Sequence, residues 1–320
     1  MIYLAADVGG TTIKLGVFIE GNLVENKSIP AQADQPMLNR LEAIRDEWQS
    51  LLDSAGLHFS DARGIGLSLP FLVDSKGCKV YGDFGKFPGA SDVNYTEWSS
   101  QEFGLPIVIE NDVRMALCGE WKHGVGQELK DVAMITLGTG IGCAAICGGK
   151  LLRGSHDRAG SALGHMTVDW QSESGRCGNV GCAEDLASTA TLTERARSEP
   201  DFAQSRLSQV ESVDFQLLFE LADSGDACSQ RLLERCLNVW SVVSMNLVLA
   251  YDPAMLILGG GVLRRQETIL PALTERLRRP VAGVCPDLSI VAGSLEDKAA
   301  LYGCQHLCQE TLDGDWSRIA

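Results

Sequence analysis

The sequence predicts an α/β protein built from two duplicated lobes, and three observations lead to this prediction. A unit made of an apolar run, a glycine turn and a second apolar run occurs twice, as LAADVGGTTIKLGVFIEGNLV and as MITLGTGIGCAAICGGKLL. Strand-like and helical patterns alternate after each copy. The chain has 320 residues, which is enough for two ordinary domains. Two copies of one supersecondary unit indicate two related lobes.

The first lobe is expected to open with three strand-like runs, at residues 3–10, 11–21 and 22–30. A helix is predicted over 36–55, where apolar residues recur at three- and four-residue steps. A strand over 64–74 and a glycine-rich irregular stretch over 75–90 follow. A short helix over 95–103 then leads into a strand over 105–112. We therefore place the small N-terminal lobe at residues 1–112, with a hinge at its end.

The second lobe begins with a helix over 113–122 and repeats the strand–glycine–strand unit over 131–152. Residues 155–184 are rich in Gly, His and Cys and are expected to be irregular, and helices dominate from 185 to 251. A strand over 255–262, a helix over 267–278 and a strand over 288–294 complete a large lobe at 113–296. The last segment, 297–320, is predicted to be a helix that returns to the small lobe.

Charge and cysteine content narrow the class of protein. The formal net charge of −15 disfavours nucleic acid and anionic membrane surfaces as partners. Eleven cysteines with no secretory signal ahead of them are typical of reduced thiols, so we expect a cytoplasmic protein. The longest apolar stretch, 239–258, is interrupted by Asn246, Asp252 and Pro253, and is too short to span a bilayer.

Two glycine turns directly follow strands, at residues 7–12 and 137–142. Glycine lets the backbone approach phosphate oxygens closely and point N–H groups at them. The carboxylate of Asp7 could hold Mg²⁺, through water. Either turn alone could be an ordinary β-hairpin turn, but two equivalent turns in duplicated units favour phosphate binding. A third cluster, Gly259 to Gly261, follows a strand, where α/β proteins bind ligands. The absence of GxxxxGK[ST] disfavours a P-loop enzyme.

Five motifs together resemble one known family. DVGGTTIKLGV, IENDVRMALCGEW, ITLGTGIGCAAICGGKLLRG, ALGH with CGNVGCAE, and LAYDPAMLILGGGV match in order and spacing the signatures of the ROK family. That family comprises sugar kinases and repressors of the actin/hexokinase-like superfamily. The resemblance implies ribonuclease-H-like, actin-like lobes with a cleft between them, and a cytoplasmic kinase that uses ATP and Mg²⁺. It assigns nucleotide and phosphate binding to Asp7, Gly9, Gly10, Thr11, Thr12, Lys14, Gly138, Thr139, Gly140, Gly260 and Gly261.

A sugar kinase needs a carboxylate that takes the proton of the attacking hydroxyl, and Asp112 is the candidate base. It lies between a strand and a helix, so a bare helix N-cap is the alternative interpretation. The resemblance places Asp112 on the family's catalytic Asp, and Asn111, His165 and Glu184 on its sugar-binding positions.

The family's zinc pattern is a His followed by three cysteines. In this chain those positions hold His165, Gly175, Cys177 and Cys182, so one ligand is missing. Structural zinc sites are nearly always four-coordinate. A cysteine from elsewhere could complete the site, water could fill the fourth position, or the site could hold no zinc.

Four residues depart from the family in the region that reads the hexose: Phe71, Lys86, Arg114 and Ala162. An acid and two amides of the family become Ala, Lys and Arg, so a bidentate hydroxyl acceptor is lost and cationic donors appear. Lys86 and Arg114 are therefore predicted to contact the substrate. The hypothesis is a substrate other than plain glucose, and the alternative is that the usual hexose is retained.

Two other functions were compared with the kinase. A DNA-binding repressor of the family carries a winged-helix domain ahead of the phosphate motif, whereas only six residues precede Asp7 here. A catalytically weak or inactive sugar sensor is motivated by Ala162 and Gly175, but the retention of Asp112 and both glycine turns disfavours it. Relatives in the family are commonly oligomers, so a homo-oligomer, in the form of a dimer, is expected.

Overall fold

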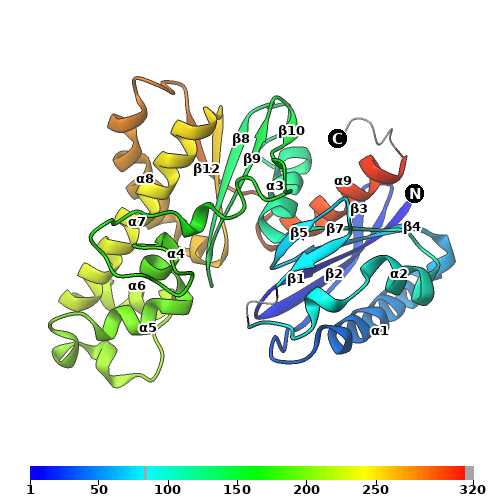
Figure 1. Ribbon diagram of the computed structural model, residues 1–320, viewed down its shortest axis with the longest axis horizontal. Helices are drawn as coiled ribbons and strands as arrows, with labels where there is room; N and C mark the ends of the chain where they lie inside the picture. Colours follow the sequence, from blue (N-terminus) through cyan, green and yellow to red (C-terminus); the bar gives the residue numbers. More distant parts are fainter. Residues whose placement is uncertain (83–84, 314–320) are drawn as a thin grey trace. The chain divides into compact units, whose positions relative to one another are not determined.

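The computed structural model describes residues 1–82 and 85–313 (Figure 1). The chain folds into two compact units. Unit 1 contains residues 1–129, 150–161 and, within the described part of the chain, 293–313. Unit 2 contains residues 130–149 and 162–292. The chain therefore passes between the units four times, and each unit is assembled from segments that are distant in sequence.

Unit 1 is built on a five-stranded sheet with the order β3-β2-β1-β4-β7. Strand β1 pairs antiparallel with β2, and β2 with β3, whereas β4 and β7 run parallel to β1. The strand bounds are β1 (Ile2–Val8), β2 (Thr12–Ile19), β3 (Asn22–Pro30), β4 (Ala62–Leu69) and β7 (Ile107–Asn111).

Helices cover both faces of this sheet (Figure 1). Alternate residues of β1 point to opposite sides of the sheet, and both sets are buried under these helices. Leu4 and Ala6 lie in one core with helix α1 (Met37–Ala55), where the indole of Trp48 donates to the carbonyl of Ala5 at 3.1 Å. Tyr3 lies in a second core with α3 (Asp112–His123) and α9 (Ala299–Asp313). Helix α2 (Tyr95–Phe103) precedes β7.

The stretch predicted to be irregular over 75–90 contains more order than expected. Strands β5 (Leu72–Asp74) and β6 (Lys79–Tyr81) form an antiparallel hairpin, and its alternation is too short to stand out in the sequence. Residues 83–84 of that stretch lie outside the described residues.

Unit 2 repeats the topology of unit 1 in the strand order β9-β8-β11-β12. Strand β8 pairs antiparallel with β9 and parallel with β11, and β12 continues the sheet in parallel. The bounds are β8 (Val132–Leu137), β9 (Ile141–Cys147), β11 (Met255–Gly259) and β12 (Ser289–Ala292), and the short strand β10 (Lys150–Leu151) belongs to segment 150–161 of unit 1. Strands β1, β2, β4 and β7 of unit 1 thus correspond to β8, β9, β11 and β12. The duplication predicted from the sequence is confirmed in the strand order of both sheets.

Helices α4 (Ala183–Ala187), α5 (Thr189–Arg197), α6 (Phe215–Asp223), α7 (Ala227–Tyr251) and α8 (Gln266–Val281) form the rest of unit 2. Helix α7 is long and apolar enough to cross a membrane, but 61% of its most apolar window is buried inside the protein. Its Trp240 is fully buried and donates to the carbonyl of Ala187 at 2.9 Å. We describe α7 as the core helix of unit 2.

The predicted boundary at residue 112 differs from the observed division. Helix α3 packs on α9 inside unit 1, so the junction of Asp112 and Val113 lies within that unit and not at its edge. The chain changes unit near 129, 149, 161 and 292 instead. These positions could not be predicted, because no Pro- or Ser-rich linker marks them. Residues 314–320 of the predicted C-terminal segment lie outside the described residues.

Candidate active site

The first glycine turn connects β1 to β2 and is closed by the N–H of Gly9, which donates to the carbonyl of Thr12 at 3.0 Å. Asp7 lies at the end of β1, just ahead of this turn. One of its carboxylate oxygens accepts from the buried hydroxyl of Ser68 at 2.7 Å, and the other lies 3.4 Å from the ammonium of Lys14. Ser68 was missed by sequence reasoning, because a serine in a buried strand carries no pattern of its own. These contacts hold a carboxylate in a fixed orientation beside the turn.

Asn111 and Asp112 mark the junction of β7 and α3. Asn111 is the N-cap residue, since its side-chain oxygen accepts from the backbone N–H of Arg114 at 3.3 Å. Its amide nitrogen donates to the carbonyl of Phe71 at 3.1 Å and to the carboxylate of Asp112 at 2.9 Å. Asp112 also accepts from the N–H of Val113 at 2.8 Å. The capping role that the sequence left open for Asp112 therefore falls to its neighbour.

The environment of Asp112 raises the pKa of its carboxyl group to about 6. Burial is the largest cause, and the negative charge of Asp7 adds to it. The N–H of Val113, the charge of Lys86 and the amide of Asn111 act in the opposite direction. A carboxylate with a pKa near 6 is ionised at neutral pH and is still basic enough to accept a proton from a hydroxyl group.

Lys86 lies beside the first glycine turn. Its ammonium nitrogen is 3.5 Å from the position that a Cβ atom on Gly10 would occupy. The next residue, Phe87, is fully buried, has a φ of 48° and donates its N–H to the carbonyl of Ala33 at 2.6 Å. This anchored backbone fixes the place of Lys86, whose positive charge acts on both the turn and Asp112.

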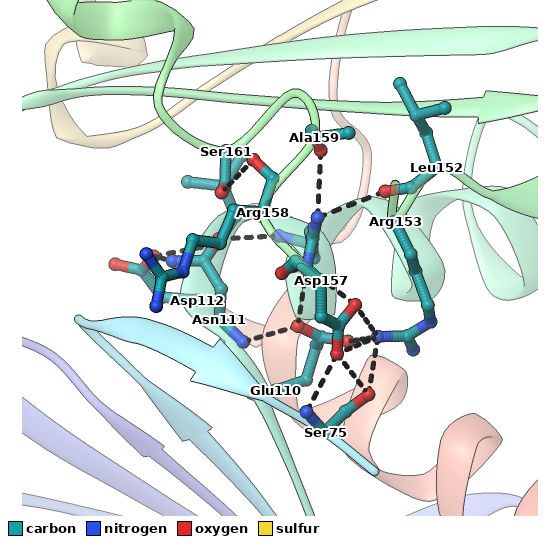
Figure 2. Close-up of polar contacts among 12 residues, drawn as sticks. Ser75, Glu110, Asn111, Asp112, Leu152, Arg153, Asp157, Arg158, Ala159 and Ser161 are labelled. Atoms are coloured by element: carbon teal, nitrogen blue, oxygen red, sulfur yellow. Dashed lines mark hydrogen bonds and ion pairs between the residues drawn. The ribbon is translucent and has the colours of Figure 1, made fainter. Parts of the chain in front are cut away.

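Arg114 is 1% exposed, and its predicted contact with substrate does not fit its surroundings. Its guanidinium donates to three backbone carbonyls, those of Leu152 at 3.1 Å, Asp157 at 2.8 Å and Ala159 at 2.8 Å (Figure 2). The side chain therefore ties segment 150–161 to helix α3 within unit 1. Phe71 is likewise 3% exposed and packs edge-to-face on Phe87.

A buried cluster of charges surrounds Arg114. Glu110, which is fully buried, forms ion pairs with Arg114 at 3.5 Å and with Arg153 at 2.7 Å. Arg153 also pairs with Asp157 at 2.9 Å, and Asp157 accepts from the hydroxyl of Ser75 at 2.7 Å (Figure 2). The negative charges of two carboxylates are balanced by the positive charges of two guanidinium groups, and buried charges need such partners. Together these side chains connect Ser75, residues 153–157 and residues 110–114, and the last of these segments contains Asp112.

The second glycine turn connects β8 to β9 in unit 2. Its carbonyls at Gly138 and Thr139 accept from the N–H groups of Thr189 and Ala190, the first residues of α5, at 3.0 and 3.1 Å. Glu184, predicted to bind sugar, accepts from the N–H of Ile141 at 2.9 Å, so its carboxylate braces this turn.

The third glycine cluster follows β11, in the same unit. Gly260 has a φ of 90°, and a Cβ atom there would lie 2.3 Å from the carbonyl oxygen of Leu137. Only glycine allows this close approach to the end of β8. The cluster and the second turn therefore meet at the carboxyl ends of two neighbouring parallel strands, where α/β proteins bind ligands.

Three metal-ligating side chains meet in unit 2. The ligand atoms of His165, Cys177 and Cys182 all lie within 4.8 Å of one another. The Cys182 sulfur is 3.5 Å from Nδ1 of His165, close to the spacing of about 3.5 Å for a thiolate and an imidazole on one tetrahedral zinc ion. The three residues fit three corners of a zinc site. Gly175 has no side chain for the fourth, so a closed structural site does not fit this chain.

The ROK family model matches residues 3–311. A beta-glucoside kinase from Listeria monocytogenes is 31% identical over 310 residues, which cover 96% of this chain and 97% of that protein.

Two solved structures share the fold. A ROK hexokinase from Thermus thermophilus is 29% identical with a TM-score of 0.81, covering 98% of this chain and 100% of that one. A ROK family glucokinase from Streptomyces griseus, solved with glucose and AMPPNP, is 28% identical with a TM-score of 0.77, covering 97% and 100%.

Proposed function

Because the chain belongs to the ROK family, we propose that it is an ATP-dependent kinase that phosphorylates a hydroxyl group of a hexose or hexose derivative. The observation that carries the proposal is the arrangement around Asp112. A carboxylate with a pKa of about 6 lies at the start of α3, and the cationic Lys86 is near both that carboxylate and a glycine turn.

We propose Asp112 as the general base. Its carboxylate accepts the proton of the attacking sugar hydroxyl while that oxygen forms a bond to the γ-phosphorus of ATP. The bond from phosphorus to the ADP oxygen breaks, and ADP leaves with the electron pair. The products are a sugar phosphate, ADP and a proton that Asp112 releases to solvent. Asn111 keeps the carboxylate oriented through its amide at 2.9 Å.

Phosphate binding is proposed for the two glycine turns and the Gly260 loop, whose backbone N–H groups suit phosphate oxygens. The ammonium groups of Lys14 and Lys86 add positive charge at the first turn. The carboxylate of Asp7 suits a Mg²⁺ ion held through water, and such an ion would neutralise charge on the phosphates. Ser68 and Lys14 hold Asp7 for this role.

Fewer of the departures from the family bear on the substrate than the sequence suggested. Phe71 and Arg114 are buried in the protein, so neither supports a changed sugar pocket. Lys86 and the exposed Ala162 remain as departures that could act on the substrate. A glucokinase and a beta-glucoside kinase among the relatives support a hexose or a hexose derivative as the first candidate.

The deciding experiment is coupled ADP release with ATP, Mg²⁺ and a panel of glucose, β-glucosides and N-acetylhexosamines. We expect one class to reach kcat/KM above about 10⁴ M⁻¹s⁻¹, the ordinary range for enzymes. Sugar binding without turnover, seen as a rise in Tm, would support the sensor instead. Turnover of glucose in that range would remove the hypothesis of an unusual sugar.

A reducing cytoplasm is the proposed location. The buried thiols of Cys118, Cys143 and Cys236 are not in disulfides, which suits a compartment that keeps thiols reduced.

A further inference from the structure

The space next to Gly175 is already filled by another residue of the chain. A Cβ atom built on Gly175 would lie 1.6 Å from a carboxylate oxygen of Asp185 and 2.6 Å from its Cγ. No real side chain tolerates such a contact. The position where the fourth thiolate would begin is therefore occupied by the carboxylate of Asp185.

Asp185 is held firmly in that place. It lies in the first turn of α4, and the residue is 5% exposed. One carboxylate oxygen accepts from the backbone N–H of Arg176 at 2.8 Å, and the other accepts from the Nε of the same residue at 3.2 Å. Both contacts reach the residue next to Gly175. Asp185 and Arg176 together are called the clamp below.

The clamp does not supply a metal ligand. Among the described residues, the set of ligand atoms within 4.8 Å of one another contains His165, Cys177 and Cys182, and Asp185 is not in it. Both of its oxygens are already engaged by Arg176. Its place outside that set, together with its two hydrogen bonds to Arg176, assigns the carboxylate to the loop and not to the metal position.

Backbone hydrogen bonds hold the same loop independently of any metal. The N–H of Gly175 donates to the carbonyl of Asn179 at 2.9 Å, and the N–H of Val168 donates to that of Gly181 at 2.9 Å. The side chain of Asn179 donates to the carbonyl of His165 at 2.8 Å. Hydrogen bonds within the loop thus connect its two ends and its turn.

We propose that the clamp replaces the fourth zinc ligand, so that the loop over residues 165–185 keeps its shape without metal. The three remaining ligands can hold a metal ion only with an open fourth position, and we expect them to hold it less tightly than four ligands would. The zinc pattern of one His and three Cys is that of the ROK family, but the proposal does not depend on the kinase activity.

The test compares the wild-type chain with Gly175→Cys, Asp185→Ala and the double variant. Bound zinc is measured by elemental analysis after zinc loading and dialysis against a chelator, and Tm is measured with and without chelator. Gly283→Cys is the matched control for an added thiol, because nothing lies within 4 Å of its Cβ position.

We expect the wild type to lose its zinc on dialysis and to keep its Tm. The double variant should retain one zinc per chain, bind it at least about 100-fold more tightly than the wild type, and lose Tm on chelation. Gly175→Cys alone should gain no zinc affinity, because Asp185 blocks the new side chain.

Two results would overturn the proposal. One is a wild type that retains stoichiometric zinc and loses Tm when zinc is removed. The other is a Gly175→Cys variant that gains as much zinc affinity as the double variant. The wild-type measurements stand even if a variant fails to fold. A chain without kinase activity but with the expected zinc behaviour would refute the proposed function and leave the clamp intact.

Discussion

Replacing Asp112 with Asn should slow phosphorylation strongly and at the same time stabilise the protein. The substitution removes the group proposed to accept the substrate proton, and loss of a general base typically slows turnover by about 10²- to 10⁴-fold. An Asn side chain keeps an oxygen that can accept from the N–H of Val113, as Asp112 does at 2.8 Å. The local structure of α3 should therefore survive the change.

The gain in stability follows from the raised pKa of Asp112. Its ordinary value of 3.8 becomes about 6 in the folded protein. Below about pH 4 the carboxyl group is protonated in both the folded and the unfolded chain. Between about pH 4 and pH 6 the unfolded chain ionises this carboxyl group while the folded chain still holds its proton, so stability is lost over that window and no longer changes above it. The difference corresponds to a cost of about 3 kcal/mol at neutral pH, which Asn does not incur.

The assay is thermal unfolding of both proteins from pH 5 to pH 7.5, together with ADP release. We expect Asp112→Asn to have the higher Tm at pH 7.5 and the difference to shrink towards pH 5. Asp34→Asn, at an exposed position in the same unit, is the control and should show no such trend. A variant that keeps turnover within about tenfold of wild type would refute the role as base. A variant without a gain in Tm at pH 7.5 would refute the argument from burial.

Three further predictions concern the surroundings of the site. Lys86→Met should raise the pKa of Asp112, because it removes a positive charge that lowers it, so the acidic limb of the kcat/KM profile should move to higher pH. Arg114→Met should lower the free energy of unfolding by about 3–5 kcal/mol in urea titrations, since buried charges and carbonyls lose their partner. Gly260→Ala should lower stability by about 1–3 kcal/mol, because its φ of 90° strains any other residue. Gly261→Ala, with open space at its Cβ position, should change it by less than about 0.5 kcal/mol in the same measurement.

Local pattern and duplication were sufficient to predict much of the fold. The helix expected over 36–55 is α1 at Met37–Ala55, and the helix expected over 95–103 is α2 with the same bounds. Both have a regular apolar face and a clear start and stop. The repeated glycine turns predicted the matching hairpins β1–β2 and β8–β9. These features are encoded by neighbours in the sequence, which is why they can be read from it.

The features that were missed depend on contacts between distant segments. Arg114 donates to carbonyls of residues 152–159, about forty positions away, and no local sequence pattern predicts those contacts. Ser68 on β4 contacts Asp7 on the neighbouring strand β1, and the 61 residues between them in the sequence hide this contact as well. Asp185 was not noticed at all, because an Asp early in a helix usually signals favourable charge at its N-terminus. Tertiary structure alone shows what each of these side chains contacts.

The departures from the family divide into two kinds once burial is known. Phe71 and Arg114 are 3% and 1% exposed, and each is accounted for by contacts within unit 1. A change in such a residue alters how the backbone behind Asp112 is held, and it gives no information about the sugar. Lys86 differs, because its ammonium acts on the carboxylate proposed to take the proton and lies beside the turn proposed to bind phosphate. A neutral amide there could donate to or accept from a hydroxyl, whereas a cation favours negative charge on the transferring phosphoryl group. Lys86 is therefore better explained by the reaction than by the identity of the sugar, which leaves Ala162 as the one departure that still points to a different substrate.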